Sequence, residues 1–81
     1  MIVTVKFYGV HRALTNTPEI RISLPKDGRV SDAISHVKGR FPALKLSQKD
    51  VLVSVNDLVT HQNHVLMADD RISFLPHIGG G

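Results

Sequence analysis

The chain has 81 residues and a formal net charge of +3, with 42% hydrophobic and 21% charged residues. A chain of this length has room for one hydrophobic core, and its composition is that of a globular protein rather than a disordered, fibrous or membrane chain. It has no cysteine, which excludes a disulfide framework, a thiolate metal site and a cysteine nucleophile. Because its basic residues are evenly spread and only 5% of its residues are aromatic, we expect no nucleic-acid partner.

The N-terminal stretch MIVTVKFYGV is apolar but is interrupted by Thr4 and Lys6. It lacks the basic start, the long apolar run and the cleavage site of a secretory signal. No stretch reaches 18 apolar residues, the length that a membrane-spanning helix needs. We therefore expect a cytoplasmic protein with no membrane partner.

Two segments near the N-terminus alternate between hydrophobic and polar residues, as strands with one buried face do. They are residues 2–8, which end at Gly9, and residues 19–24. The polar residues 16–18 lie in the segment between them, which we expect to be a connection. The pattern predicts an antiparallel hairpin.

A helical pattern follows from Ser31 to Phe41. Its hydrophobic stripe starts one residue earlier and has spacings of four, three and four residues, at Val30, Ile34, Val37 and Phe41. Ser31 is the expected N-cap, although Ile34 occupies the place of a capping-box Glu or Gln. Pro42 is expected to stop the helix.

Three further strands are expected in the second half of the chain. Residues 51–55 alternate and are followed by the turn residues Asn56-Asp57, with a short strand at 58–59. The last strand covers 71–75, with Ile72 and Phe74 facing inward, and Pro76 ends the pairing because it has no N–H to donate. One helix cannot cover both faces of such a sheet, so we expect a two-layer α+β domain with one face partly open.

The chain ends in HIGGG, residues that add no stability to a compact domain. Such a segment either has no function or acts outside the folded domain. Five residues after Pro76 span roughly 17 Å when fully extended, at about 3.3–3.6 Å per residue.

Three stretches carry a resemblance over nearly the whole chain: "DDRISFLPHIGGG", "VSVND" and "DAISHVKGRFP". They resemble the MoaD/ThiS family of ubiquitin-like β-grasp sulfur carriers, most closely its MoaD branch. The resemblance implies a β-grasp domain at 1–76, with a mixed four- to five-stranded sheet packed on one main helix. It also implies an extended, flexible C-terminal tail at 77–81.

The function implied by this resemblance centres on the terminal carboxylate of Gly81. A MoeB-like activating enzyme would adenylate it with ATP, and the resulting thiocarboxylate would deliver sulfur to a MoaE-like large subunit for molybdopterin synthesis. Gly79 and Gly80 would thread a narrow channel, although the family usually has a larger residue at the position of Gly79. The chain would be a sulfur-donating subunit rather than an enzyme on its own, with no cofactor of its own.

A partner-docking surface is expected on the open sheet face. Tyr8 and Leu75 point away from the core, and the β-grasp arrangement would place their strands side by side. Leu58 and Val59 would extend this surface. Pro76 and Ile78 are the remaining candidate contact residues. Isolated exposed hydrophobic residues are also common on proteins without any partner.

Several alternatives stay open. The carrier could serve thiamin or amino-acid synthesis, or act as a ubiquitin-like modifier, or its glycines could be incidental to a plain interaction module. A classical enzyme is disfavoured because no nucleophile elbow, phosphate loop or zinc-protease motif is present. His61 and His64 are three residues apart, but neither cysteine nor clustered carboxylates complete a site, so no metal is expected.

Overall fold

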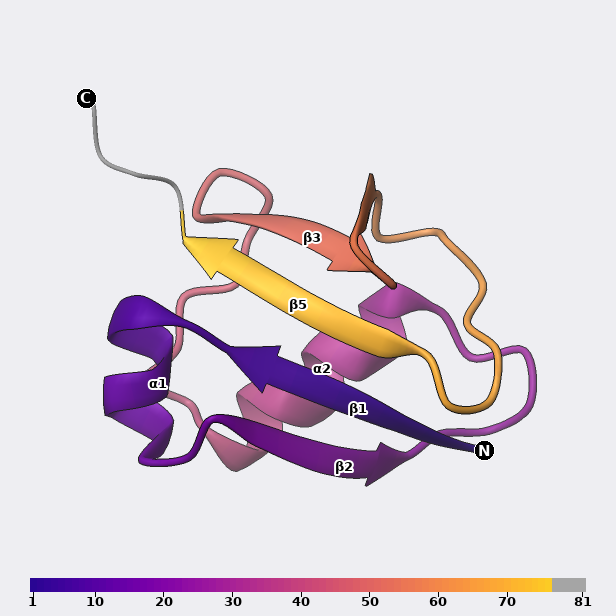
Figure 1. Ribbon diagram of the computed structural model, residues 1–81, viewed down its shortest axis with the longest axis horizontal. Coiled ribbons are helices and arrows are strands. Elements are labelled where there is room, and N and C mark those ends of the chain that lie inside the picture. The colour runs from indigo at the N-terminus through magenta and orange to yellow at the C-terminus, as the bar shows by residue number, and fades with distance from the viewer. Residues whose placement is uncertain (77–81) are drawn as a thin grey trace.

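Alternating hydrophobic residues form the strands of one mixed sheet in the computed structural model, which describes residues 1–76 (Figure 1). Its elements in this range are the strands β1 (Ile2–Phe7), β2 (Glu19–Ser23), β3 (Val51–Val55), β4 (Leu58–Thr60) and β5 (Arg71–Pro76), and the helices α1 (Gly9–Thr15) and α2 (Val30–Arg40). The expected two-layer α+β architecture is confirmed.

The five strands are ordered β2-β1-β5-β3-β4 across the sheet. β1 pairs with β5 in parallel, with Phe7 opposite Phe74, and all other neighbours are antiparallel. The hairpin pairing of β1 with β2 and the contact between the first and last strands are therefore confirmed. The last strand before the C-terminal residues lies in the middle of the sheet.

The hydrophobic core lies between the sheet and α2, which crosses behind the strands in Figure 1. Val30, Ala33 and Val37 of α2 are fully buried, as are Ile72 and Phe74 of β5. The remaining core residues come from the other strands and from the loops: Val3, Val5, Phe7, Ile20, Ile22, Leu24, Ile34, Leu44, Leu46, Val51, Val53, Val55 and Leu66. We call the face that packs on α2 the inner face and the opposite one the outer face. Neither described helix covers the outer face.

Helix α2 begins earlier than the sequence predicts. Its N-cap is Arg29 rather than Ser31, and the Arg29 N–H donates to Oδ2 of Asp32 at 2.7 Å. Asp32, not Ile34, therefore occupies the third helical position, where a carboxylate stabilises the exposed N–H groups of the first turn. The helix ends at Arg40, just before Phe41 and Pro42, as predicted.

The expected polar connection after the first strand contains a helix, α1, so that prediction was wrong. Its buried side chains are polar, His11 and Thr15, while Val10 and Leu14 are exposed. The spacing of Val10, Ala13 and Leu14 is helical, but this stripe faces outward. Asn16 ends the helix in the left-handed conformation, with φ of 57°.

Strand ends differ from the predicted ones by one residue. β1 stops at Phe7 instead of Tyr8, β4 extends to Thr60, and β5 continues to Pro76, whose register partner is Val51. Between β3 and β4, Asn56 and Asp57 have φ values of 51° and 71°. Two consecutive left-handed residues form the tight turn that suits the twist of a hairpin.

The predicted boundary between a domain at 1–76 and a tail at 77–81 stays a prediction, because residues 77–81 lie outside the described residues. Among the helices within 1–76, neither has the length and hydrophobicity to cross a membrane.

The central position of β5 makes its inward side chains sensitive to truncation. We expect Ile72→Val to lower the free energy of unfolding by about 1 kcal/mol, because Ile72 is fully buried and the lost methylene leaves a cavity. The same change at the exposed Ile2 should cost less than about 0.5 kcal/mol. Urea titration of both variants measures the difference, and equal losses would contradict the described packing.

Candidate partner-docking surface

Three hydrophobic side chains form a row across the outer face near the end of β5. Leu75 lies opposite Leu52 of β3, and Tyr8 follows the register pair Phe7–Phe74 on the other side. Their exposed fractions are 36% for Leu75, 46% for Leu52 and 42% for Tyr8. We call Tyr8, Leu75 and Leu52 the apolar row.

Tyr8 is held in position by the elements on both sides of it. Its backbone angles, φ of −133° and ψ of 154°, continue the extended path of β1. Its carbonyl accepts the N–H of His11 at 3.0 Å at the start of α1. The strand and the helix therefore fix the backbone that presents this side chain next to Leu75.

Two small polar residues lie beside the apolar row on the outer face. Ser73 of β5 and Ser54 of β3 are directly opposite each other, and both are buried. Lys6 is opposite Ser73, and Val59 of β4 is opposite Ser54. Val59 therefore lies diagonally from Leu52, within the reach of neighbouring side chains on one sheet face.

The structure brings some of the predicted contact residues together and separates others. Val59 shares the outer face with Tyr8 and Leu75, whereas Leu58 lies opposite Val55, whose side chain faces the core. Leu58 is 74% exposed and lines a hollow of about 400 Å³ on the inner side of β4, together with Val65 and Met67. Pro76 ends β5 and is partly buried. The remaining predicted residues, Ile78, Gly79, Gly80 and Gly81, lie outside the described residues.

Leu52 is a contact candidate that the sequence analysis did not select. Its alternation with Val51 and Val53 already placed it on the outer face. Only the antiparallel register between β3 and β5, which pairs Leu52 with Leu75, reveals that the two side chains are neighbours.

A buried histidine lies beneath this site. His11 is only 4% exposed, and within residues 1–76 no group hydrogen-bonds its Nδ1. Burial lowers the pKa of His11 from its ordinary value, and the nearby backbone of Phe74 has a smaller, opposing effect on this pKa. The His11 imidazole of α1 therefore lies near the backbone of β5, one residue before Leu75.

Charged groups lie near the end of β5 as well. Asp50 directly precedes β3, and the hydrogen bond from Ser47 holds the pKa of its carboxyl below the usual value, with smaller effects from Lys49 and Lys45.

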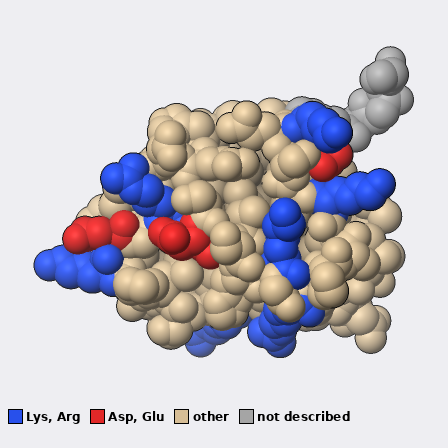
Figure 2. Space-filling model, turned by 180° about the vertical axis from the view of Figure 1, so that it is seen from behind, with Lys and Arg blue, Asp and Glu red and all other residues tan. Residues whose placement is uncertain are grey.

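On the side where α2 lies, Figure 2 shows Lys and Arg in separate small groups with Asp and Glu among them. This face of the described chain therefore presents no continuous basic surface.

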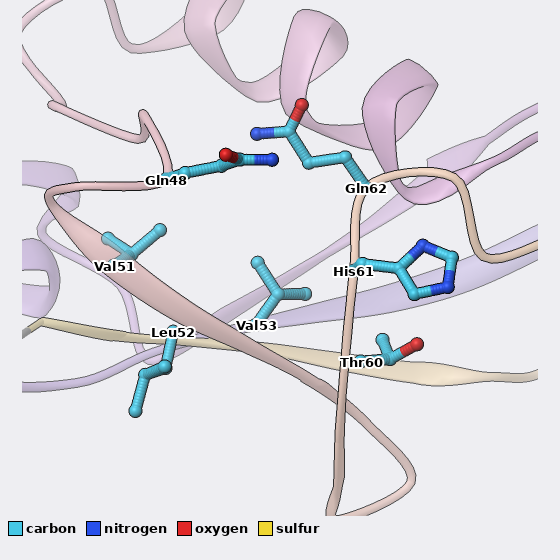
Figure 3. Close-up of a pocket in the computed structure, with 7 residues that line it drawn as sticks. All are labelled: Gln48, Val51, Leu52, Val53, Thr60, His61 and Gln62. Atoms are coloured by element: carbon cyan, nitrogen blue, oxygen red, sulfur yellow. The ribbon is translucent and has the colours of Figure 1, made fainter.

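A second hollow, of about 200 Å³, opens between β3 and β4 (Figure 3). Its lining residues are Gln48, Val51, Leu52, Val53, Thr60, His61 and Gln62. The Gln48 and Gln62 side chains point toward each other, whereas the His61 ring points away from them. Nδ1 of His61 accepts the N–H of Asn63 at 3.1 Å. Within residues 1–76, no three His, Asp or Glu side chains gather as a metal site would require.

The mixed sheet packed on α2 is the fold of a ubiquitin-like β-grasp protein, and a family match assigns the chain to the sulfur-carrier class. The ThiS family model matches residues 5–81, and the chain therefore belongs to the ThiS family. The expected fold and family are confirmed.

Individual relatives span the same length. The molybdopterin synthase sulfur carrier subunit of Mycobacterium tuberculosis is 25% identical over 80 residues, which are 98% of this chain and 96% of the relative. SAMP1 from Haloferax volcanii has a TM-score of 0.87 at 19% identity, and the match covers 100% of both chains. The complex of subunits 1 and 2 of molybdopterin-converting factor from Helicobacter pylori also contains a similar chain. That match has a TM-score of 0.66 at 24% identity and covers 100% of both chains.

The buried His11 predicts that stability depends on pH. Since its folded-state pKa is lowered, the unfolded chain binds a proton more readily, and stability present above pH of about 6.5 is lost as the pH falls below that value. We expect a lower urea midpoint at pH of about 5.5 than at about 7.5.

The control for this prediction compares two histidine variants. His11→Leu should reduce the difference between the two pH values, whereas His36→Gln should keep it, because the side chain of His36 is exposed. A difference that survives in His11→Leu would assign the pH dependence to other groups.

Proposed function

We propose that this chain carries sulfur as a thiocarboxylate on Gly81 and donates it for molybdopterin biosynthesis as the small subunit of a molybdopterin synthase. The main support is the full-length match to the sulfur carrier subunit of M. tuberculosis. The match to the ThiS family runs through Gly81, so the terminal glycines are part of the family pattern. The apolar row lies at the end of the strand that leads to these glycines.

The proposed chemistry needs only a reachable carboxylate from this chain. A carboxylate oxygen of Gly81 attacks the α-phosphorus of ATP on a MoeB-like enzyme, and pyrophosphate leaves. Hydrosulfide then adds to the acyl carbon, AMP leaves, and a thiocarboxylate remains. A free carboxylate is a poor electrophile, and the mixed anhydride supplies the leaving group that it lacks.

The chain's role in this proposal is to dock and to present its end. The apolar row offers a Tyr and two Leu side chains on a sheet face that no described helix covers. Aromatic and hydrophobic side chains of this kind are the usual anchors of protein interfaces. In the H. pylori complex, a protein of this fold is assembled with a second subunit, which supports a MoaE-like partner here.

Charge introduced into the apolar row should weaken docking. We expect Leu75→Asp or Tyr8→Asp to raise the dissociation constant for the MoeB-like or MoaE-like partner by at least about tenfold, because a carboxylate would be desolvated in the interface. Titration calorimetry measures the affinity, and urea titration checks stability.

Ile2→Asp is the matched control, because Ile2 is as exposed as Tyr8, at 42%, and lies at the opposite end of β1 from the apolar row. It should leave the affinity within about twofold of the unmodified chain. If Leu75→Asp lost stability and affinity together, Leu75 would belong to the core rather than to a docking surface.

A bulky residue near the terminus should block activation. We expect Gly80→Val to fold normally but to form no adenylate with ATP and the MoeB-like enzyme, because a branched side chain cannot follow a narrow channel. Intact-mass spectrometry detects the added AMP. Gly39→Val is the control, since nothing lies within 4 Å of a Cβ added there. Normal adenylation of Gly80→Val would refute the threading step.

The acceptor pathway is tested separately. The molybdopterin role predicts that the chain co-purifies with a MoaE-like subunit. Co-purification with a thiazole synthase would instead assign the sulfur to thiamin, and covalent attachment to lysines would indicate a protein modifier. Deleting Gly80 and Gly81 without any loss of sulfur transfer would refute all carrier roles.

A further inference from the structure

The two edges of the sheet differ in how well they are protected. At one edge, β2 carries the exposed charged residues Glu19 and Arg21, and Pro18 and Pro25 lie next to it. At the other edge, β4 presents Leu58 and Val59, 74% and 68% exposed, without a charged residue, a proline or a bulge within the strand. Charges, prolines, bulges and a very short strand are the devices that limit pairing at an edge, and of these β4 has only its short length of three residues.

The turn geometry shows which backbone groups of β4 are free. Because Asn56 and Asp57 form a two-residue turn, Val55 and Leu58 exchange hydrogen bonds, and so do Val53 and Thr60. The pair between them, Ser54 and Val59, does not, so the N–H and C=O of Val59 point away from β3. Within residues 1–76, no backbone group donates to the Val59 C=O, and none accepts a hydrogen bond from the Val59 N–H.

This edge is complementary to itself. Antiparallel pairing of two β4 strands about a two-fold axis at Val59 lets each Val59 N–H donate to the Val59 carbonyl of the other copy. The same register places Leu58 opposite Thr60 and Asp57 opposite His61 of the second copy. The Asp57 side chain is 89% exposed, although it lies 3.8 Å from Arg71.

The side chain of His61 can donate a hydrogen bond in such a contact. Because its Nδ1 accepts the Asn63 N–H, the neutral ring carries its proton on Nε2. In Figure 3 the ring points away from the Gln48 and Gln62 side chains. Its Nε2–H can therefore donate to the carboxylate of Asp57 across the axis, once on each side.

We propose that two copies of this chain associate through β4 and form one continuous sheet. The pairing has one reciprocal main-chain exchange, a Val59–Val59 contact and two Asp57–His61 contacts. An interface this small is below the size of stable complexes, and the dissociation constant is on the order of 0.1–1 mM. This association does not depend on the proposed sulfur-carrier role, and its test uses this chain alone.

A charge on the two-fold axis tests the proposal. Val59→Lys places two ammonium groups opposite each other and should weaken association at least about tenfold. Val10→Lys is the matched control, because Val10 is an exposed valine on α1, outside β4. Sedimentation velocity of the full chain from about 0.05 to about 2 mM measures the association constants. A chain that stays monomeric throughout, or equal weakening by both variants, would overturn the proposal.

The register is tested by residue-specific data. In a mixture of isotope-labelled and unlabelled chains, intermolecular NOEs should connect Leu58 with Thr60 and Val59 with Val59. Asp57→Asn and His61→Gln should each weaken association about two- to tenfold, and the double variant should weaken it no further than either single one. Intermolecular NOEs that involve β2 instead would show that the other edge associates and would refute the β4 pairing.

Discussion

Parallel pairing between β1 and β5 brings the first and last strands of the chain together at the centre of the sheet. Parallel strands cannot be joined by a tight turn, so the intervening chain has to return across a sheet face, and α2 covers the inner one. Because β5 has neighbours on both sides, Ile72 and Phe74 are completely buried. The strand that leads to the terminal glycines is therefore anchored in the most buried part of the fold.

The same register builds the candidate docking surface. After Phe7 pairs with Phe74, the next residues on the two strands are Tyr8 and Leu75, and β3 adds Leu52 on the other side. The backbone N–H of His11 at the start of α1 donates to the Tyr8 carbonyl and so helps to fix the backbone of Tyr8. In the proposed function, the folded part supplies position alone, because the reacting group is the terminal carboxylate and the nucleotide chemistry belongs to a partner.

The sequence predicted the features that follow from short-range patterns within one element, and it did not predict those that depend on contacts between distant segments. Period-two alternation identified β1, β2, β3 and β5 and their inward residues, because each side chain's face follows from its own strand, whereas β4 was predicted only from its place after the turn Asn56-Asp57. The helix α1 was missed because its buried side chains, His11 and Thr15, are polar, so its hydrophobic stripe faces outward. Leu52 and Leu58 required the register between strands, which short-range patterns do not contain. The inward prediction for Ile72 and Phe74 implies an outward Ser73, but the burial of Ser73 results from the neighbouring strands.

Val59 belongs to both surfaces through different atoms. Its side chain lies on the outer face near Leu52, whereas its N–H and C=O point along the sheet plane beyond β4. A partner that covers only the outer face leaves these backbone groups free, so docking and self-pairing can occur together. A partner that adds its own strand to β4 uses the same two groups and competes with the second copy. At concentrations well below the expected dissociation constant the edge is free, so weak self-pairing does not obstruct a tighter partner.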